Sequence, residues 1–271
     1  MSETDHSVTS AELDEYIFRK SVHMQVILQG LLKAAGDLRN KRCLAIGSPN
    51  AMMSRQLRAA GGSWKELVFD ENSAANIKAI VGDSDIKLFD EGKSLPFDSK
   101  SFDIIIILDG LSERESDYDF VEMCHKILNP DGRLIVCVPR EKRMSIIGPL
   151  RSLLGVSEEV YSERRLFDIL KNGFDVMQMR SSSRFFIEMI DAVVQGVSRR
   201  RRGRGVDEQM QVYKIAYAFY FIAYQLDVLI FLAKGHRLIA SAKRHAWRSR
   251  DAPVLSDGRS ISEAVLKPLS G

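Results

Sequence analysis

Short apolar runs alternate with amphipathic helical patterns along most of this 271-residue chain. The plainest strand contains four consecutive isoleucines, residues 104–107. A continuous β-branched run of this kind favours a strand that is buried on both faces of a parallel sheet. Strands that alternate with helices predict βαβ units and a doubly wound α/β sheet. The predicted strands are "RCLAIG", "KELVFD", "FDIIIILDG", "RLIVCVPR" and "FDVMQMRS".

The pattern changes at both ends of this alternation. Residues 1–40 are predicted to form a helical lead-in, and residues 41–184 the α/β core. Residues 185–235 are predicted to form an apolar and basic helical cap, inserted before a final core strand within residues 236–248. The polar tail, residues 249–271, is expected to be loose.

Three stretches resemble the class I S-adenosylmethionine-dependent methyltransferases, in particular the branch that acts on small and lipid-like molecules. "LPFDSKSFDIIIILDGLSE" resembles the run into the fourth strand of that family, and "ELVFDENS" resembles its second strand with a terminal acid. "CHKILNPDGRLIVCVP" resembles the helix, Pro-x-Gly turn and fifth strand that follow. The resemblance covers residues 31–179, with 237–244 as a final strand. It implies a Rossmann-like, mostly parallel seven-stranded sheet and S-adenosylmethionine as the cofactor.

The same resemblance implies a set of cofactor-binding residues. In open α/β sheets, ligands bind beyond the carboxyl ends of the strands. Asp70, at the end of the second strand, would hold the ribose hydroxyls, and either Asp90 or Glu91 would meet the adenine amino group. Asp109 ends the fourth strand, on the side of the methionine and the substrate. The methionine-side loop would consist of Gly47, Ser48 and Asn50.

The turn after the first strand departs from the family pattern of an acid followed by Gly-x-Gly-x-Gly. Ala45 replaces the acid, Gly47 is kept, and Pro49 and Ala51 replace the other glycines. Proline has no backbone N–H to donate, and both replacements carry a Cβ where close backbone approach is wanted. We expect Ser48 to cap the next helix with Pro49 at its first position, which would keep a helix N-terminus at the crevice.

Two functions are compatible with this degenerate loop, and they differ in whether the protein still binds the cofactor. The first is methyl transfer from S-adenosylmethionine to a hydrophobic small molecule or lipid-like acceptor. The alternative is a catalytically inactive protein that uses the same fold as a binding or membrane-associated adaptor. Methyl transfer mainly requires two reactants held in line, so the catalytic residues stay unassigned. His23, on the lead-in, is a candidate base near the substrate, although a histidine on such a helix is more often exposed or packed.

Composition and charge indicate a folded protein and do not predict a nucleic-acid-binding or metal-binding one. The chain is 45% hydrophobic, with a net charge of only +3, which favours a folded core and does not predict nucleic-acid binding. The five histidines are scattered and the cysteines lack metal-ligand spacing, so no metal site is predicted. The N-terminus has no signal-peptide core, so a cytoplasmic location is expected. The three cysteines are Cys43, Cys124 and Cys137.

The predicted cap contains an apolar stretch, Val212 to Ala233, that is long enough to cross a bilayer. Lys214 and Asp227 within it disfavour a membrane span. If residues 237–244 form a core strand, both ends of the stretch also return to the same globular body. Two interpretations remain: a packed cap, or peripheral contact with a membrane through residues 199–233, with the arginines of 199–204 on anionic headgroups.

Overall fold

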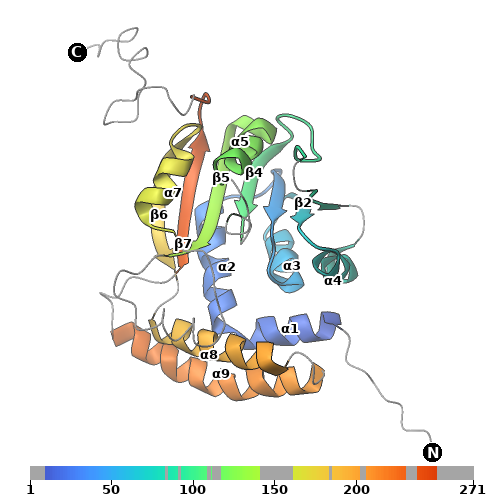
Figure 1. The fold of residues 1–271 in the computed structure, drawn as a ribbon, viewed down its shortest axis with the longest axis vertical. Coiled ribbons are helices and arrows are strands. Elements are labelled where there is room, and N and C mark those ends of the chain that lie inside the picture. The colour runs from blue at the N-terminus through green and yellow to red at the C-terminus, as the bar shows by residue number, and fades with distance from the viewer. Residues whose placement is uncertain are drawn as a thin grey trace, which may run out of the picture.

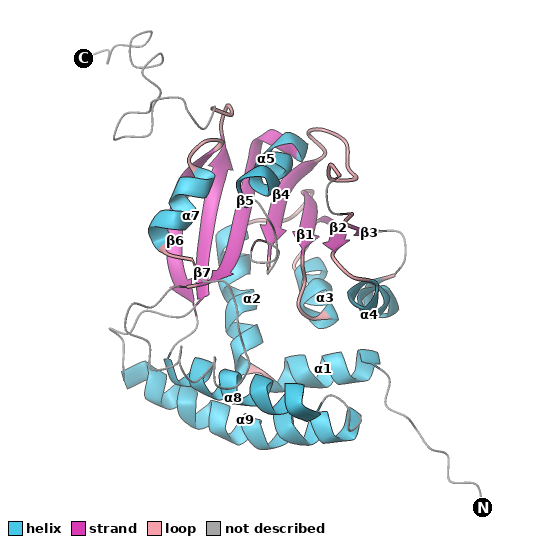
Figure 2. Ribbon diagram, in the orientation of Figure 1, coloured by secondary structure: helices cyan, strands magenta, loops and turns pink. Residues whose placement is uncertain are grey.

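The computed structural model describes residues 10–82, 85–90, 93–108, 111, 117–140, 161–182, 185–201, 206–229 and 237–248. Within these residues, seven strands form one sheet in the order β3-β2-β1-β4-β5-β7-β6 (Figures 1 and 2). β7 runs antiparallel to both of its neighbours, and the other pairs are parallel. The predicted doubly wound, mostly parallel seven-stranded sheet is therefore confirmed. The strands are β1 (Arg42–Ile46), β2 (Ser63–Val68), β3 (Ile86–Leu88), β4 (Phe102–Ile107), β5 (Leu128–Pro139), β6 (Phe174–Ser182) and β7 (Arg237–Arg244).

Helices cover both faces of the sheet, and the isoleucine run of β4 explains why. Ile105 and Ile107 pack into the core on the face covered by α5 and α7, whereas Ile104 and Ile106 pack on the face covered by α2 and α3. All four are buried, as expected for a strand with two covered faces. The described helices are α1 (Ser10–Lys20), α2 (Val22–Ala35), α3 (Ala51–Ala59), α4 (Glu71–Val81), α5 (Asp117–Ile127), α7 (Glu163–Leu170), α8 (Phe185–Arg201) and α9 (Val206–Leu229).

The "NPDG" stretch, expected to be a turn between a helix and a strand, lies within β5. Phe102 pairs with Leu128, but Ile104 already pairs with Arg133, so the intervening residues of β5 bulge out of the ladder. The glycine of this bulge has no room for a side chain, because a Cβ on Gly132 would lie 2.5 Å from Leu128 Cγ. The turn residues therefore act as an irregular start to the strand.

Helices α1, α8 and α9 form a further layer beyond the carboxyl ends of the parallel strands (Figure 1). α8 and α9 lie side by side and connect β6 to β7 in the sequence. Their facing side chains form a core of their own, around the fully buried Tyr220, and Tyr16 and Ile17 of α1 pack against it. None of the described helices is long and apolar enough to cross a membrane.

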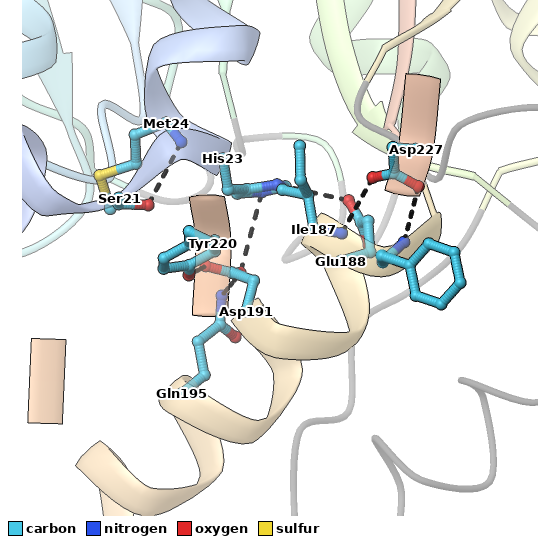
Figure 3. Close-up of polar contacts among 10 residues, drawn as sticks. Ser21, His23, Met24, Ile187, Glu188, Asp191, Gln195, Tyr220 and Asp227 are labelled. Carbon is cyan, nitrogen blue, oxygen red and sulfur yellow. Dashed lines mark hydrogen bonds and ion pairs between the residues drawn. The ribbon is translucent and has the colours of Figure 1, made fainter. Parts of the chain in front are cut away.

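Buried polar side chains bind this layer together (Figure 3). Asp227 of α9 is 1% exposed and accepts hydrogen bonds from the backbone N–H groups of Phe186 and Ile187, at 2.9 and 3.1 Å. Tyr220 donates its hydroxyl hydrogen to Asp191 of α8, at 2.7 Å. The carboxylate that looked out of place in an apolar helix thus satisfies the first N–H groups of α8.

We predict that Asp227→Ala lowers the free energy of unfolding by about 1–2 kcal/mol, because it removes the acceptor for two N–H groups at the start of α8. Asp227→Asn keeps one acceptor oxygen and should lose less. Urea unfolding followed by circular dichroism measures both changes. Equal stability of Asp227→Ala and the unchanged protein would contradict a capping role.

Candidate functional site at the carboxyl edge of the sheet

The loops that follow β1, β2, β3 and β4 all begin at one edge of the sheet, because these strands are parallel neighbours. Backbone hydrogen bonds extend the ladders into the loops. Gly47 N–H donates to the Leu67 carbonyl at 2.9 Å, and Leu108 N–H donates to the Ile46 carbonyl at 2.9 Å. Phe89 N–H donates to the Val68 carbonyl at 2.8 Å. The sequence-predicted site residues of the described loops therefore gather at a single edge.

Gly47 makes the tight turn at the end of β1 with a φ of 66°. This left-handed conformation is one that a side chain disfavours, so the retained first glycine has a structural reason. Ser48 follows it and is buried. Its hydroxyl accepts a hydrogen bond from the Ser54 hydroxyl at 2.9 Å and donates to the Asn50 carbonyl at 3.3 Å.

The expectation that Ser48 caps the next helix, with Pro49 at its first position, is wrong. Asn50 is the N-cap of α3, and its side-chain oxygen accepts a hydrogen bond from Met52 N–H at 2.9 Å. Pro49 lies outside the helix and is exposed. The Ser48 hydroxyl points into the protein toward Ser54, so it is not available to the helix end.

Ala51, which stands at one of the missing glycines, has its methyl group in the core. It is 1% exposed and packs in a small cluster with Val68 of β2 and Ile77 of α4. The Cβ that would hinder a close ligand approach is therefore used to pack α3 against its neighbours.

Asp14 of α1 binds the N-terminus of α3, a contact that the sequence did not predict. Its carboxylate accepts a hydrogen bond from Ala51 N–H at 3.1 Å, and its carbonyl accepts one from the Asn50 side-chain amide at 3.2 Å. Met52 and Met53 N–H groups both bond to Asn50, so the first three N–H groups of α3 are all engaged. Burial raises the pKa of Asp14, while the Ala51 N–H acts in the opposite direction.

A carboxylate at a helix N-terminus lies where such helices bind anionic ligands. Asp14 therefore occupies the position at which an anionic ligand would bind the N-terminus of α3. No local signal in the sequence marks Asp14, because its partners are 36 and 37 positions away.

Asp70 and Asp90 lie two residues beyond the ends of β2 and β3, and Val68 pairs with Leu88, so the two acids are at the same level of the sheet. Asp70 is the N-cap of α4. It accepts hydrogen bonds from Ser73 N–H at 2.8 Å and from the Ser73 hydroxyl at 2.7 Å, which lower its pKa. Asp70 stays exposed despite these bonds, and Asp90 is exposed and paired with Lys93.

The structure describes the position of only some of the other sequence-predicted residues. Glu91 and Asp109 lie outside the described residues. His23, in the first turn of α2, is buried against α8, 3.5 Å from a Glu188 oxygen and 3.9 Å from an Asp191 oxygen (Figure 3). All three cysteines are buried thiols outside any disulfide, and within the described part of the chain no group of side chains could hold a metal ion.

Comparisons with known proteins agree with this fold. Residues 44–136 match the family model of a methyltransferase domain. This stretch spans β1 to β5 and includes Gly47, Asp70 and Asp90. A comparison with curated protein sequences gives no match.

Solved structures of low sequence identity share the fold. An S-adenosylmethionine-dependent methyltransferase from Mesorhizobium loti superposes with a TM-score of 0.52 at 16% identity, over 80% of this chain and 96% of that chain. A candidate methyltransferase from Bacillus halodurans gives 0.55 at 12% identity, over 81% and 99%. The (4+2)-cyclase SpnF gives 0.52 at 15% identity, over 90% and 85%. At these identities the likeness establishes the fold, and function must come from the site.

The chain thus has the class I methyltransferase fold, and residues 44–136 match the model of a methyltransferase domain. The domain match and the fold together support an S-adenosylmethionine-dependent methyltransferase.

We predict that Asp70→Ala lowers the free energy of unfolding by about 1 kcal/mol at pH 7, through loss of the α4 cap. The folded-state pKa of Asp70 is depressed, so its stabilisation is present above the usual carboxyl pKa of about 3.9 and is lost as the pH falls through the lower folded value. The difference between the two proteins should therefore shrink on acidification.

Urea unfolding at pH 7, 5 and 3 measures this difference. Asp168→Ala is the matched control, because Asp168 is an exposed acid on α7 that pairs with Lys171 in a surface ion pair. A pH-independent loss in Asp70→Ala would contradict the assignment.

Proposed function

We propose that this protein transfers a methyl group from S-adenosylmethionine to a hydrophobic small molecule or lipid-like acceptor. The observation that carries the proposal is the position of the α1–α8–α9 layer. This apolar and aromatic layer lies beyond the carboxyl edge of the sheet, where Gly47 and Asp70 also lie (Figure 1). An acceptor bound at this layer would meet apolar side chains, such as those that line the groove between α8 and α9.

The proposed cofactor contacts follow the strand ends. Asp70 would accept hydrogen bonds from the ribose hydroxyls, since its exposed carboxylate has lone pairs beyond those used by Ser73. Asp90 or Glu91 would meet the adenine amino group, and Asp109 would lie near the methyl group. Gly47, Ser48 and Asn50 would form the turn beside the methionine part. The cofactor supplies an activated methyl group on its sulfonium, and the task of the protein is to hold the acceptor in line with it.

Part of this edge suits the cofactor as it stands, and part of it is occupied by Asp14. The Gly47 turn and the exposed Asp70 suit the cofactor. The N-terminus of α3 suits its carboxylate only when Asp14 moves away, because the two anions would compete for Ala51 N–H. We therefore propose that α1 shifts when the cofactor binds.

We predict that S-adenosylmethionine and S-adenosylhomocysteine bind the purified protein with micromolar dissociation constants, measured by calorimetric titration. Asp70→Ser should weaken both by at least about tenfold, because a hydrogen bond to a charged group contributes about 1.5–3 kcal/mol. Serine retains the helix cap and cannot reach the ribose, which separates binding from folding.

Asp37→Ser is the control for this titration, since Asp37 is an exposed acid paired with Arg39 away from the carboxyl edge. Absence of binding up to millimolar ligand by folded protein would refute the cofactor assignment. The adaptor function on the same fold would then be preferred.

We predict that Asp14→Ala tightens S-adenosylmethionine binding by about fivefold, because an anion at a helix N-terminus contributes about 0.3–2 kcal/mol that the cofactor must otherwise displace. Asp14→Asn removes the charge and keeps a hydrogen-bond acceptor, so its effect should be smaller. The same titration measures both. Weaker binding by Asp14→Ala would mean that Asp14 supports the bound state, and the competition would be excluded.

A further inference from the structure

The outward face of α9 carries large apolar side chains that nothing in the described structure covers. The inward face is a buried stripe at helical spacing, Tyr213, Ala216, Tyr220 and Ala223, which packs against α8 and α1. On the opposite side Ile215 is 65% exposed and Phe221 is 62% exposed. A contiguous exposed apolar patch on a folded protein commonly marks an interaction site. The exposed apolar residues of α9 are Ile215, Tyr217, Phe219, Phe221, Ile222, Tyr224 and Leu226.

An apolar groove of about 450 Å³ lies between α8 and α9 and continues this face. Every side chain that lines it is apolar. Protein–protein interfaces carry roughly one hydrogen bond per 100–200 Å² of buried area, so a protein partner would find few polar groups here. A hydrocarbon chain requires none. The lining includes Ile190, Val193 and Val197 of α8 and Val212, Ile215 and Phe219 of α9.

Positive charge adjoins the same face. The last three residues of α8 are Arg199–Arg201, and Arg199 is two positions after Val197, which lines the groove. Lys214 is exposed on α9, and the Lys20 ammonium lies 4.2 Å from the centre of the Tyr217 ring. On α1 the exposed charges are mixed, with Glu12 and Glu15 beside Arg19. The basic residues beside this face thus come from α8, α9 and the end of α1, and Glu208 of α9 is a partly exposed acid.

We propose that the outer face of the α8–α9 hairpin docks on an anionic membrane surface. Apolar and aromatic side chains of α9 would enter the acyl boundary, and the arginines of α8 would lie at the phosphate headgroups. A helix pair that lies in the plane of the interface, with tyrosines and a lysine among its apolar residues, has the side chains that suit this boundary. The hairpin does not need to cross the bilayer.

Docking in this orientation rests on and extends the proposed function, because the carboxyl edge of the sheet would then lie on the far side of a single helical layer from the membrane. A lipid-like acceptor would reach the site past this layer. Vesicle binding is measured without cofactor, so its failure is distinct from failure of cofactor binding.

The test is flotation of the full-length protein with vesicles of phosphatidylcholine alone and with about 30% phosphatidylglycerol. The protein should float with the anionic vesicles. The double variant Phe221→Ser/Ile222→Ser should lose at least about tenfold in vesicle affinity, because two side chains no longer enter the acyl region. Arg199→Ser/Arg200→Ser/Arg201→Ser should lose the dependence on anionic lipid.

Phe167→Ser/Met177→Ser is the matched control, since both residues are large, apolar and exposed on α7 and β6, away from the hairpin. Its binding should equal that of the unchanged protein, and circular dichroism checks that each variant is folded. The proposal is overturned if the unchanged protein does not bind anionic vesicles, or if the Phe221/Ile222 variant binds as well as the control. It is also overturned if light scattering shows a dimer that this variant splits, because a second copy would then cover the face.

Discussion

The parallel ladder between β1, β2, β3 and β4 is the constraint on which the rest of this structure depends. Because both faces of the sheet are covered by helices, side chains that bind a ligand must lie at an end of the strands. Four loops begin at one edge, and Gly47, Asp70 and Asp90 come with them. The helical layer beyond that edge closes the remaining side. The carboxyl ends of the parallel strands, rather than any single sequence motif, thus determine where a ligand-binding site can lie.

The core of the fold could be predicted from the sequence because its signals are local. The isoleucine run of β4 and the alternation of strands and helices specify a buried parallel sheet. Residues 237–244 also form a strand, β7. The irregular start of β5 could not be foreseen, because a Pro-Asp-Gly sequence suits a turn as well as a bulge. The bulge forms because Phe102 of β4 pairs with Leu128, on the far side of this Pro-Asp-Gly sequence from Arg133.

The site was predicted less completely, and the reason is again physical. Gly47 and Asp70 stand at positions fixed by neighbouring strands, so a short sequence window contains their signal. The sequence predicts Ser48 as the N-cap of α3. In the structure the Ser48 side chain is hydrogen-bonded to the buried Ser54 hydroxyl, and Asn50 is the N-cap. Asp14 reaches the loop from a separate helix, and only tertiary structure brings the two together. The ligand contacts of Asp70 and Asp90 remain proposals.

The packing of Ala51 links the loop after β1 to the core. Its methyl group fills the space between Val68 and Ile77, so a glycine here would leave a void and weaken the start of α3. The core therefore favours alanine at this position, whatever a ligand at this edge would prefer. The shape of the loop can thus be altered with less loss of stability at neighbours such as Asp14 than at Ala51 itself.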